Sequence, residues 1–278
     1  PLNPAYKEDE FRFYLEDTAA RLLLLPRDGA EEARRAAGDR VPILVVDMDS
    51  AGTVTLSEAT RGRSVTVPAV DDVALILHTS GSTGRPKRVP LAHANLSISA
   101  GNVARSYALG PDDVSLCVMP LFHVHGLVAS TLATLATGGA VVVPSRFSPL
   151  SFWRVALDHG VTWYSAVPTL HQLLLARADA PSGRPAGAER LRFIRSCSAS
   201  LPPQVMHDLE AAFATADPAD AAVYQGNLTA YSARLDQLDA DNQAKFAKLP
   251  PAQRKLVTNH DAFGYYVDRY QLEFVGSV

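Results

Sequence analysis

The stretch VALILHTSGSTGRPK, residues 73–87, decides the fold prediction. Its first five residues are aliphatic and partly β-branched, a composition typical of a buried strand. The nine residues TSGSTGRPK (79–87) that follow contain two glycines and four hydroxyl side chains and end on a lysine. A helix-like pattern starts a few residues later, near His93. A strand, a glycine-rich turn and a helix in this order predict an α/β protein with an anion site at the turn.

The chemistry of residues 79–87 suits a polyphosphate. Glycines let the backbone come close to a ligand, and hydroxyl groups, backbone N–H groups and a lysine can surround phosphate oxygens. The stretch differs from the GxxxxGK[ST] loop, because Lys87 follows Pro86 and no Ser or Thr follows Lys87. Composition alone leaves a flexible Ser/Gly turn equally open. The candidate phosphate-binding residues are Thr79, Ser80, Gly81, Ser82, Thr83, Gly84 and Lys87.

Strand-like and helix-like segments alternate on both sides of this stretch. Short β-branched runs predict strands at 43–46, 65–67, 73–77, 114–119, 140–143, 162–165 and 191–196. Apolar residues at helical spacing predict helices at 10–25, 93–107, 126–136, 152–159, 169–178 and 202–212. This alternation predicts the α/β class, with a mixed or parallel sheet covered by helices.

The pattern changes after Phe213. Asp217 and Pro218 form a helix start, and an apolar stripe of a long amphipathic helix follows. The stripe consists of Tyr224, Leu228, Tyr231, Leu235 and Leu238. A predicted strand (255–258), helix (261–270) and strand (272–275) then complete a helix–βαβ tail. We therefore predict two domains, residues 1–213 and 214–278.

Composition narrows the function classes. The 278 residues are 47% hydrophobic and 20% charged, which is typical of a globular protein. The formal net charge of -3 argues against a partner such as nucleic acid or an anionic membrane surface. The two cysteines, Cys117 and Cys197, cannot build a disulfide framework or a zinc ribbon, so we expect a reducing compartment.

Neither a leader nor a membrane span is expected. Residues 1–6 lack the basic-then-apolar pattern of a signal peptide. Residues 114–145 contain no Asp, Glu, Lys or Arg, but Pro120, two histidines and a Gly-Gly pair interrupt the apolar run. A membrane-spanning helix needs about 20 mostly apolar residues. A buried strand–helix–strand is therefore the prediction for 114–145.

The order of residues in TSGSTGRPK resembles the phosphate loop of the acyl-adenylate-forming (AMP-binding) superfamily. Three more segments match that superfamily in the same order: PLFHVHG (120–126), WYSAVPT (163–169) and SCSASL (196–201). Together with PLNPAY (1–6), they are most similar to acyl-activating enzymes of the oxalate–CoA ligase type. The resemblance covers residues 1–213.

This resemblance implies a two-step ligase. The carboxylate of an acid attacks the α-phosphate of ATP, and the thiol of coenzyme A then displaces AMP from the acyl-adenylate. By match, Thr79–Thr83 and Lys87 would hold the ATP phosphates, and His123 would lie at the mouth of the acyl pocket. Ser198, Ala199 and Ser200 would border the adenine. The implied ligands are ATP, Mg²⁺, coenzyme A and a small carboxylic acid, with oxalate as the expectation. For His125 we favour a structural role.

Several positions depart from the family pattern. Arg88 stands where the loop usually has glycine, and its side chain could crowd the turn or contact a phosphate. The segment 224–230 (YQGNLTA) only partly matches the family's Tyr-x-x-Thr-Glu, and it lacks the glutamate that holds magnesium. The family's ribose-binding aspartate, hinge and catalytic lysine are also not found. We therefore expect an incomplete ligase with weak activity or none.

The tail resembles a second family. The segments DPADAAVY (217–224) and VTNHDAFGYY (257–266) are similar to the periplasmic zinc-binding component of ABC transporters, over residues 217–278. By match, His260 would be a zinc ligand. Zinc sites need three or four ligands, so a structural role for His260 stays open.

The two families belong to different compartments, and we expect a cytoplasmic protein from the ligase part. The pairing predicts a fusion of two gene fragments. The alternatives to a ligase are then a zinc-binding module and a fusion without function.

Overall fold

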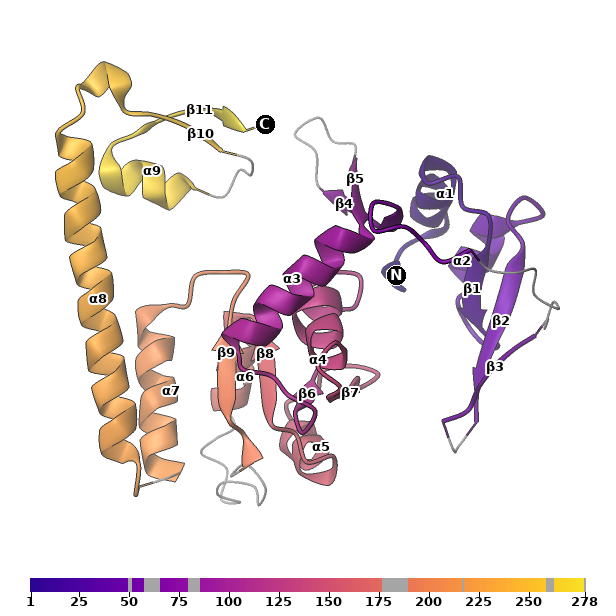
Figure 1. Cartoon of the computed structure of the whole chain (residues 1–278), viewed down its shortest axis with the longest axis horizontal. Coiled ribbons are helices and arrows are strands. Elements are labelled where there is room, and N and C mark those ends of the chain that lie inside the picture. Colours follow the sequence, from indigo (N-terminus) through magenta and orange to yellow (C-terminus); the bar gives the residue numbers. More distant parts are fainter. Residues whose placement is uncertain are drawn as a thin grey trace. The chain divides into compact units, whose positions relative to one another are not determined.

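The computed structural model describes residues 1–49, 52–57, 66–79, 86–176, 190–216, 218–258 and 263–277. Six predicted site residues lie outside these ranges: Ser80, Gly81, Ser82, Thr83, Gly84 and His260. The chain divides into two compact units (Figure 1). The first unit comprises Pro1–Val167 and Pro185–Ser198, and the second comprises Pro168–Arg184 and Ala199–Val278.

The first unit is built on a four-stranded sheet in the order β7-β6-β8-β9, and all its pairs are parallel. Its strands are β6 (Val114–Leu116), β7 (Ala140–Val142), β8 (Trp163–Ala166) and β9 (Phe193–Ser196). All four residues of β8 are buried, and the Trp163 ring stacks on Phe193 with centroids 5.2 Å apart. The predicted parallel α/β sheet is thus confirmed, with a hydrophobic central strand that is buried on both faces.

Helices precede the first strand of this sheet and connect the strands that follow. They are α3 (His93–Ser106), the π-helical segment η1 (His125–Leu132), α4 (Ala133–Leu135) and α5 (Phe152–Asp158). Ala100 of α3 packs against Val128 and Ala133. At the start of η1, a Cβ on Gly126 would collide with the backbone carbonyl oxygens of Met119 and Pro120. The close approach of η1 to the segment after β6 therefore requires glycine at this position.

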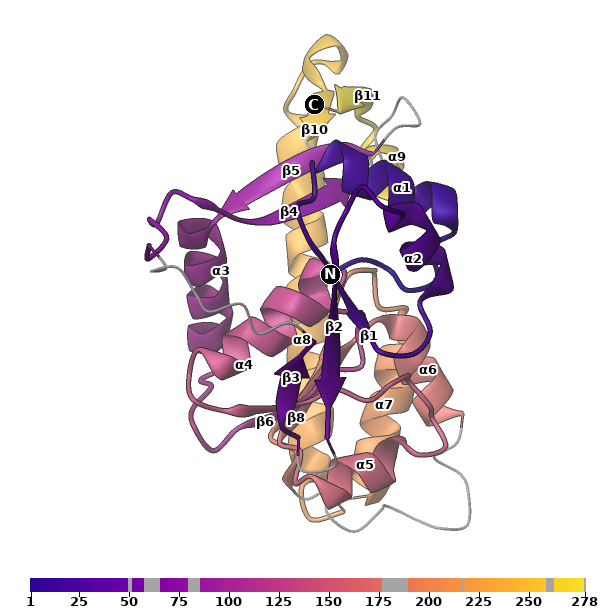
Figure 2. The same cartoon turned by 90° about the vertical axis from the view of Figure 1, so that its right-hand side faces the viewer.

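A β-hairpin carries the ends of the predicted phosphate loop. Strands β4 (Val73–Thr79) and β5 (Lys87–Ala92) are antiparallel, and Thr79 lies opposite Lys87 (Figure 2). We predicted a turn that leads directly into the helix at His93, and that prediction is wrong, because β5 lies between them. The proline in β5, Pro90, hides this strand in the sequence, since proline is rare inside strands.

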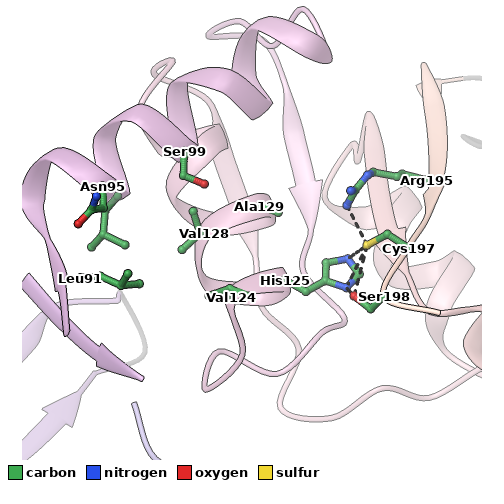
Figure 3. A pocket seen from close by; sticks show the side chains of 11 residues that line it. Leu91, Asn95, Ser99, Val124, His125, Val128, Ala129, Arg195, Cys197 and Ser198 are labelled. Atoms are coloured by element: carbon green, nitrogen blue, oxygen red, sulfur yellow. Dashed lines mark hydrogen bonds between the residues drawn. The ribbon is translucent and has the colours of Figure 1, made fainter. Parts of the chain in front are cut away.

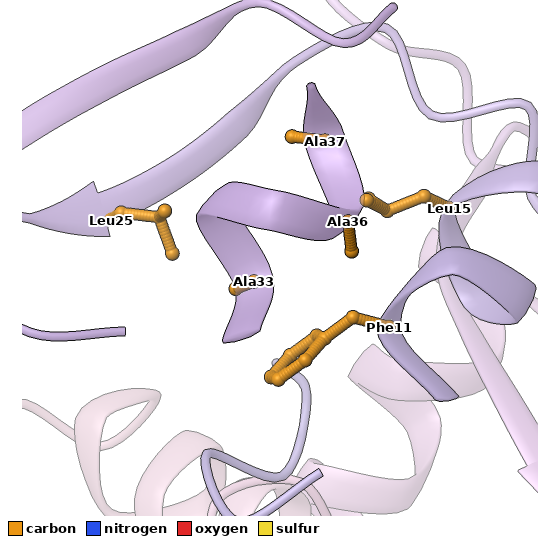
Figure 4. Packing of buried hydrophobic residues seen from close by; sticks show 6 residues of the cluster. All are labelled: Phe11, Leu15, Leu25, Ala33, Ala36 and Ala37. Atoms are coloured by element: carbon orange, nitrogen blue, oxygen red, sulfur yellow. The ribbon is translucent and has the colours of Figure 1, made fainter. Parts of the chain in front are cut away.

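The N-terminal part of the first unit forms a small layer of its own. Its elements are α1 (Glu8–Asp17), β1 (Leu23–Pro26), α2 (Glu31–Ala37), β2 (Ile43–Met48) and β3 (Val54–Leu56). Phe11 and Leu15 pack against three buried alanines of α2 and against Leu25 (Figure 4). The helix predicted for 10–25 ends at Asp17, and Leu23–Pro26 instead pairs in parallel with β2. The strand expected at 65–67 is not seen at residues 66 and 67, and β3 pairs with β2 instead.

The second unit contains helices and one parallel strand pair. Its elements are α6 (Pro168–Leu175), α7 (Pro203–Ala216), α8 (Ala221–Ala247), η3 (Pro251–Gln253), β10 (Lys255–Thr258), α9 (Gly264–Tyr270) and β11 (Glu273–Ser277). Strands β10 and β11 are parallel, with α9 between them in the chain, so the predicted helix–βαβ tail is confirmed. The carboxylate of Asp239 in α8 accepts two hydrogen bonds from α9. Arg269 Nη2 donates to Oδ2 at 2.5 Å, and the Tyr270 hydroxyl donates to Oδ1 at 2.9 Å.

Helices α6 and α7 belong to the same compact unit as the C-terminal tail. Phe213 of α7 contacts Tyr224 of α8, with ring centroids 5.8 Å apart. The predicted domain boundary between residues 213 and 214 stays a prediction. Among the helices that the structure describes, none is long and apolar enough to cross a membrane.

Candidate functional site

A cavity of about 380 Å³ lies in the first unit (Figure 3). Its lining combines apolar side chains from β5, α3 and η1, two polar side chains of α3 (Asn95 and Ser99), and polar side chains from the end of β9. The lining residues are Leu91, Asn95, Leu96, Ser99, Val124, His125, Val128, Ala129, Arg195, Cys197 and Ser198. The lining residues that the structure describes include no Asp or Glu, so the one full charge among them is the guanidinium of Arg195.

The topology of the sheet explains why these residues meet. Strands β6, β8 and β9 are parallel, so their carboxyl ends share one edge of the sheet. His125 follows β6, Ser165 lies within β8, and Cys197 directly follows β9. Open parallel sheets bind ligands at this edge. The helix that begins at His125 has the wide π-helical turn, which is often found at functional sites.

The polar side of the cavity is a hydrogen-bonded cluster around His125, which is only 6% exposed. Its Nε2 lies 2.7 Å from Ser165 Oγ and its Nδ1 lies 3.0 Å from Ser198 Oγ. The sulfur of Cys197 lies 3.3 Å from Nδ1 and 3.2 Å from Nε2. Arg195 Nη1 donates to Cys197 Sγ at 2.9 Å and to Ser165 Oγ at 3.3 Å. The two serines therefore fix the imidazole ring beside a thiol and a cation.

Arg195 also contacts an aromatic ring. Its guanidinium carbon lies 5.4 Å from the centroid of the Tyr107 ring, within the range of a cation–π contact. Burial raises the pKa of Tyr107 above its usual value, although the Arg195 cation acts in the opposite direction. Tyr107 is thus a neutral support for the cation at physiological pH. A supported cation beside an apolar wall suits a small ligand that carries a carboxylate.

The ends of the predicted phosphate loop are exposed at the tip of the β4–β5 hairpin. Thr79 and Lys87 both face solvent, and the residues between them, 80–85, lie outside the described ranges. Arg88 contacts the end of α1, because its Nη1 donates to the backbone oxygen of Asp17 at 2.5 Å. His78 contacts the carboxylate of the same aspartate at 2.9 Å. Arg88 therefore ties the hairpin to the end of α1.

The structure places the two histidines of PLFHVHG differently. His123 is exposed, contacts the ring of Phe122 with centroids 4.7 Å apart, and does not line the cavity. His125, for which we favoured a structural role, is the histidine that lines it. Of the three residues predicted to border the adenine, Ser198 lines the cavity, whereas Ala199 and Ser200 are exposed.

Ser165, Arg195 and Cys197 were not identified as site residues from the sequence. Ser165 belongs to β8, and the other two lie at the end of β9, next to the predicted Ser198. One available signal was the rule that parallel strands present their carboxyl ends at one edge of the sheet. Applied to segments 162–165 and 191–196, this rule would have selected all three.

Comparison with known protein families shows which family the chain belongs to. The family model described as AMP-binding enzyme matches residues 1–226, well over half of the chain. The chain belongs to the AMP-binding enzyme family. The superfamily predicted from TSGSTGRPK is thereby confirmed.

Curated relatives in this family are CoA ligases. The chain is 43% identical over 223 residues to the oxalate–CoA ligase of Arabidopsis thaliana, covering 77% of this chain and 43% of the relative. It is 37% identical over 283 residues to the oxalate–CoA ligase of Saccharomyces cerevisiae, covering 92% and 49%. It is 40% identical over 218 residues to a sulfoacetate–CoA ligase of Cupriavidus necator, covering 77% and 42%. The chain thus spans about half the length of the curated relatives it matches.

Solved structures confirm the fold. A malonyl-CoA ligase in a ternary product complex with methylmalonyl-CoA and AMP superposes with a TM-score of 0.63 at 30% identity, covering 76% of this chain and 43% of that chain. MatB from Rhodopseudomonas palustris with ATP bound superposes with a TM-score of 0.62 at 26% identity, covering 76% and 42%. The AMP-binding family fold is therefore present, in part, in this chain.

A second family model matches the other end of the chain. The model described as zinc-uptake complex component A, periplasmic, matches residues 198–278 and overlaps the first match at 198–226. The resemblance predicted for the tail is thereby confirmed at the level of the family. Within the described ranges, no group of three or more His, Cys, Asp or Glu side chains could hold a metal ion.

Proposed function

We propose that residues 1–226 form the acid- and nucleotide-binding part of an acyl-CoA ligase, which activates a small carboxylic acid with ATP. The carrying observation is the cavity at the carboxyl edge of the parallel sheet, with Arg195 as its charged group. In a chain of the AMP-binding family, a cationic pocket at this edge suits the acid. Its volume of about 380 Å³ suits a small acid, and the relatives named for oxalate and sulfoacetate support that size class.

The chemistry requires the acid and the α-phosphate to be held side by side. Carboxylates are weak nucleophiles, so positioning and charge neutralisation supply most of the rate enhancement. We assign charge neutralisation at the phosphates to Lys87 and hydroxyl contacts to Thr79, at the two ends of the hairpin loop. Ser80, Gly81, Ser82, Thr83 and Gly84 complete this proposed loop from sequence alone. The roles of His123 beside the acyl group and of Ser198, Ala199 and Ser200 beside the adenine rest on the family resemblance alone, because only Ser198 among them lines the cavity.

We further propose that turnover by this chain is weak or absent. The segment 224–230 lacks the glutamate expected from the family pattern, and the described lining of the cavity provides no carboxylate for Mg²⁺. The described residues that line the cavity therefore do not fit a magnesium ion. Nucleotide binding and complete catalysis are then separate properties, and they can be measured separately.

Equilibrium binding of ATP to the full chain tests the proposal. Lys87→Ala removes the charge at the loop and should weaken ATP binding at least about tenfold, since a hydrogen bond to a charged group contributes about 1.5–3 kcal/mol. The control is Lys255→Ala, which alters an exposed lysine of β10 that lies 4.0 Å from Glu273. Wild-type protein that binds no ATP, or equal affinities in both variants, would reject the proposed site.

A second candidate function is zinc binding by the tail, favoured by the family match over 198–278. His260 is its proposed ligand, and it lies outside the described residues. Titration of the full chain with zinc should then show stoichiometric uptake that His260→Ala abolishes and His159→Ala preserves. Zinc uptake without ATP binding would reverse the order of the two candidates. If neither ligand binds, the chain is a fusion without either function.

A further inference from the structure

The cavity contains a thiol that the ligase chemistry does not use. The chain has two cysteines, and they lie in contrasting surroundings. Cys117 is 3% exposed, and its sulfur lies near the backbone oxygens of Met119 and Gly126. Cys197 is partly exposed and lines the cavity. Only Cys197 can therefore meet a molecule that enters the cavity.

The groups around Cys197 are those that make a thiol nucleophilic. The sulfur lies 3.2 Å from Nε2 and 3.3 Å from Nδ1 of His125, so the ring nitrogen that carries no proton is within reach of the thiol proton. Ser165 and Ser198 hold the ring at its two nitrogens, which keeps it beside the sulfur. Arg195 places a positive charge 2.9 Å from the sulfur (Figure 3). A cysteine with a positioned histidine and a nearby cation is the arrangement of reactive thiols in proteins.

We propose that Cys197 is a site of covalent modification by small α,β-unsaturated carbonyl compounds. In this addition the sulfur forms a bond to the β-carbon, and the electrons of the carbon–carbon double bond shift toward the carbonyl group. The thiol proton passes to His125 and from there to the α-carbon, so no leaving group, oxidant or further reactant is needed. The apolar side chains of Leu91, Leu96 and Val128 receive the carbon skeleton, and Arg195 lies beside the carbonyl oxygen. The adduct fills the cavity and excludes other ligands.

N-ethylmaleimide, an α,β-unsaturated imide, is the probe. The full native chain is treated with a small excess of N-ethylmaleimide at neutral pH, and peptide mass spectrometry follows both cysteines in the same sample. Cys197 should react at least about tenfold faster than Cys117, and the difference should vanish in denaturant. Equal rates in the native protein, or no reaction at Cys197, would overturn the proposal.

Two variants separate activation from simple exposure. His125→Gln should slow the reaction of Cys197 at least about fivefold, whereas His159→Gln, which alters an exposed histidine of the same unit, should leave it unchanged. Cys117 reports folding in every variant, because it reacts fast only when the core opens. If His125→Gln unfolds the protein, Arg195→Gln replaces it and should slow Cys197 severalfold while Cys117 stays protected. Unchanged Cys197 rates in folded variants would show that exposure alone governs the thiol and would overturn the proposal.

Discussion

Strand β8 and helix α8 represent two opposite ways of placing apolar residues. All four residues of β8 are buried, including Trp163 at 0% exposure. Helix α8 has 27 residues, and none of them is buried. Three members of its apolar stripe, Tyr231, Leu235 and Leu238, are 53%, 42% and 53% exposed.

The two elements differ in burial because different numbers of neighbouring elements cover their apolar residues. A continuous apolar run becomes a central strand when neighbouring strands and helices cover both faces, as they do for β8. An apolar stripe buries area only where a partner packs on it. Along α8 the contacts include α7 at Tyr224 and α9 at Asp239 and Phe246. Periodicity therefore predicts the element in both cases, but it predicts burial only for β8. Stability should depend on the sheet and hardly at all on the stripe.

The largest expected difference comes from truncating one residue in each region. Trp163→Ala leaves a cavity where the indole stacked on Phe193 and should lower the free energy of unfolding by about 3–5 kcal/mol. Leu235→Ala in α8 should change it by less than about 0.5 kcal/mol, as is usual for surface positions. Urea unfolding followed by far-UV circular dichroism checks both values. Similar losses in the two variants would contradict the contrast between the regions.

Two glycines, one in η1 of the sheet-containing unit and one in α8, provide a second pair of substitutions with smaller expected effects. Gly126→Ala places a Cβ on the carbonyl oxygens of Met119 and Pro120, so the backbone must shift, and we expect a loss of about 1–3 kcal/mol. Gly226 lies inside α8, and a methyl group added to its Cα would have no atom within 4 Å apart from its chain neighbours and the nearby backbone of the same helix. Gly226→Ala should therefore stabilise the helix by up to about 1 kcal/mol. Thermal unfolding measures both shifts, and a gain from Gly126→Ala would refute the close packing of η1.

The smallest effect concerns pH and the contact of α8 with α9. Hydrogen bonds from Arg269 and Tyr270 lower the pKa of Asp239 below its usual value of 3.8. Because the folded state has the lower pKa, the contact stabilises the fold above pH 3.8, and this stabilisation is lost as the pH falls through the folded pKa. Asp239→Asn should lower the melting temperature slightly at pH 7. The gap from wild type should narrow as the pH falls below 3.8, and a gap that widens there would contradict this assignment.

Much of the fold follows from the sequence because its signals are local. The alternation of β-branched runs and helical stripes predicted the sheet strands and the helix–βαβ tail. The helix predicted for 10–25 failed in its second half, because the pairing of Leu23–Pro26 with β2 depends on residues about 20 positions away. Strand β5 was not predicted because it contains Pro90, and proline is rare inside strands. Long-range pairing overrode the local pattern in both cases.

The sequence predicted which segments form the site, but not which of their residues line the cavity. PLFHVHG and SCSASL both contribute to the cavity, as the family pattern implies. The motif cannot separate His123 from His125, which are two residues apart, because the choice depends on where the π-helical turn begins. Arg195 lies just outside SCSASL and Cys197 inside it, but the segment assigns neither a role, which follows only from their distances to the other side chains of the cluster.

One measurement tests the central claim, that a small cavity at the carboxyl edge of the sheet serves an acyl-CoA ligase reaction. Hydrogen–deuterium exchange is recorded for the full chain with and without a stable acyl-adenylate analogue, such as an acyl sulfamoyl adenosine. We predict slower exchange in segments 73–92, 119–129 and 193–200, with no change in 221–277. Protection confined to the tail, or no protection at any segment at saturating analogue, would contradict the account.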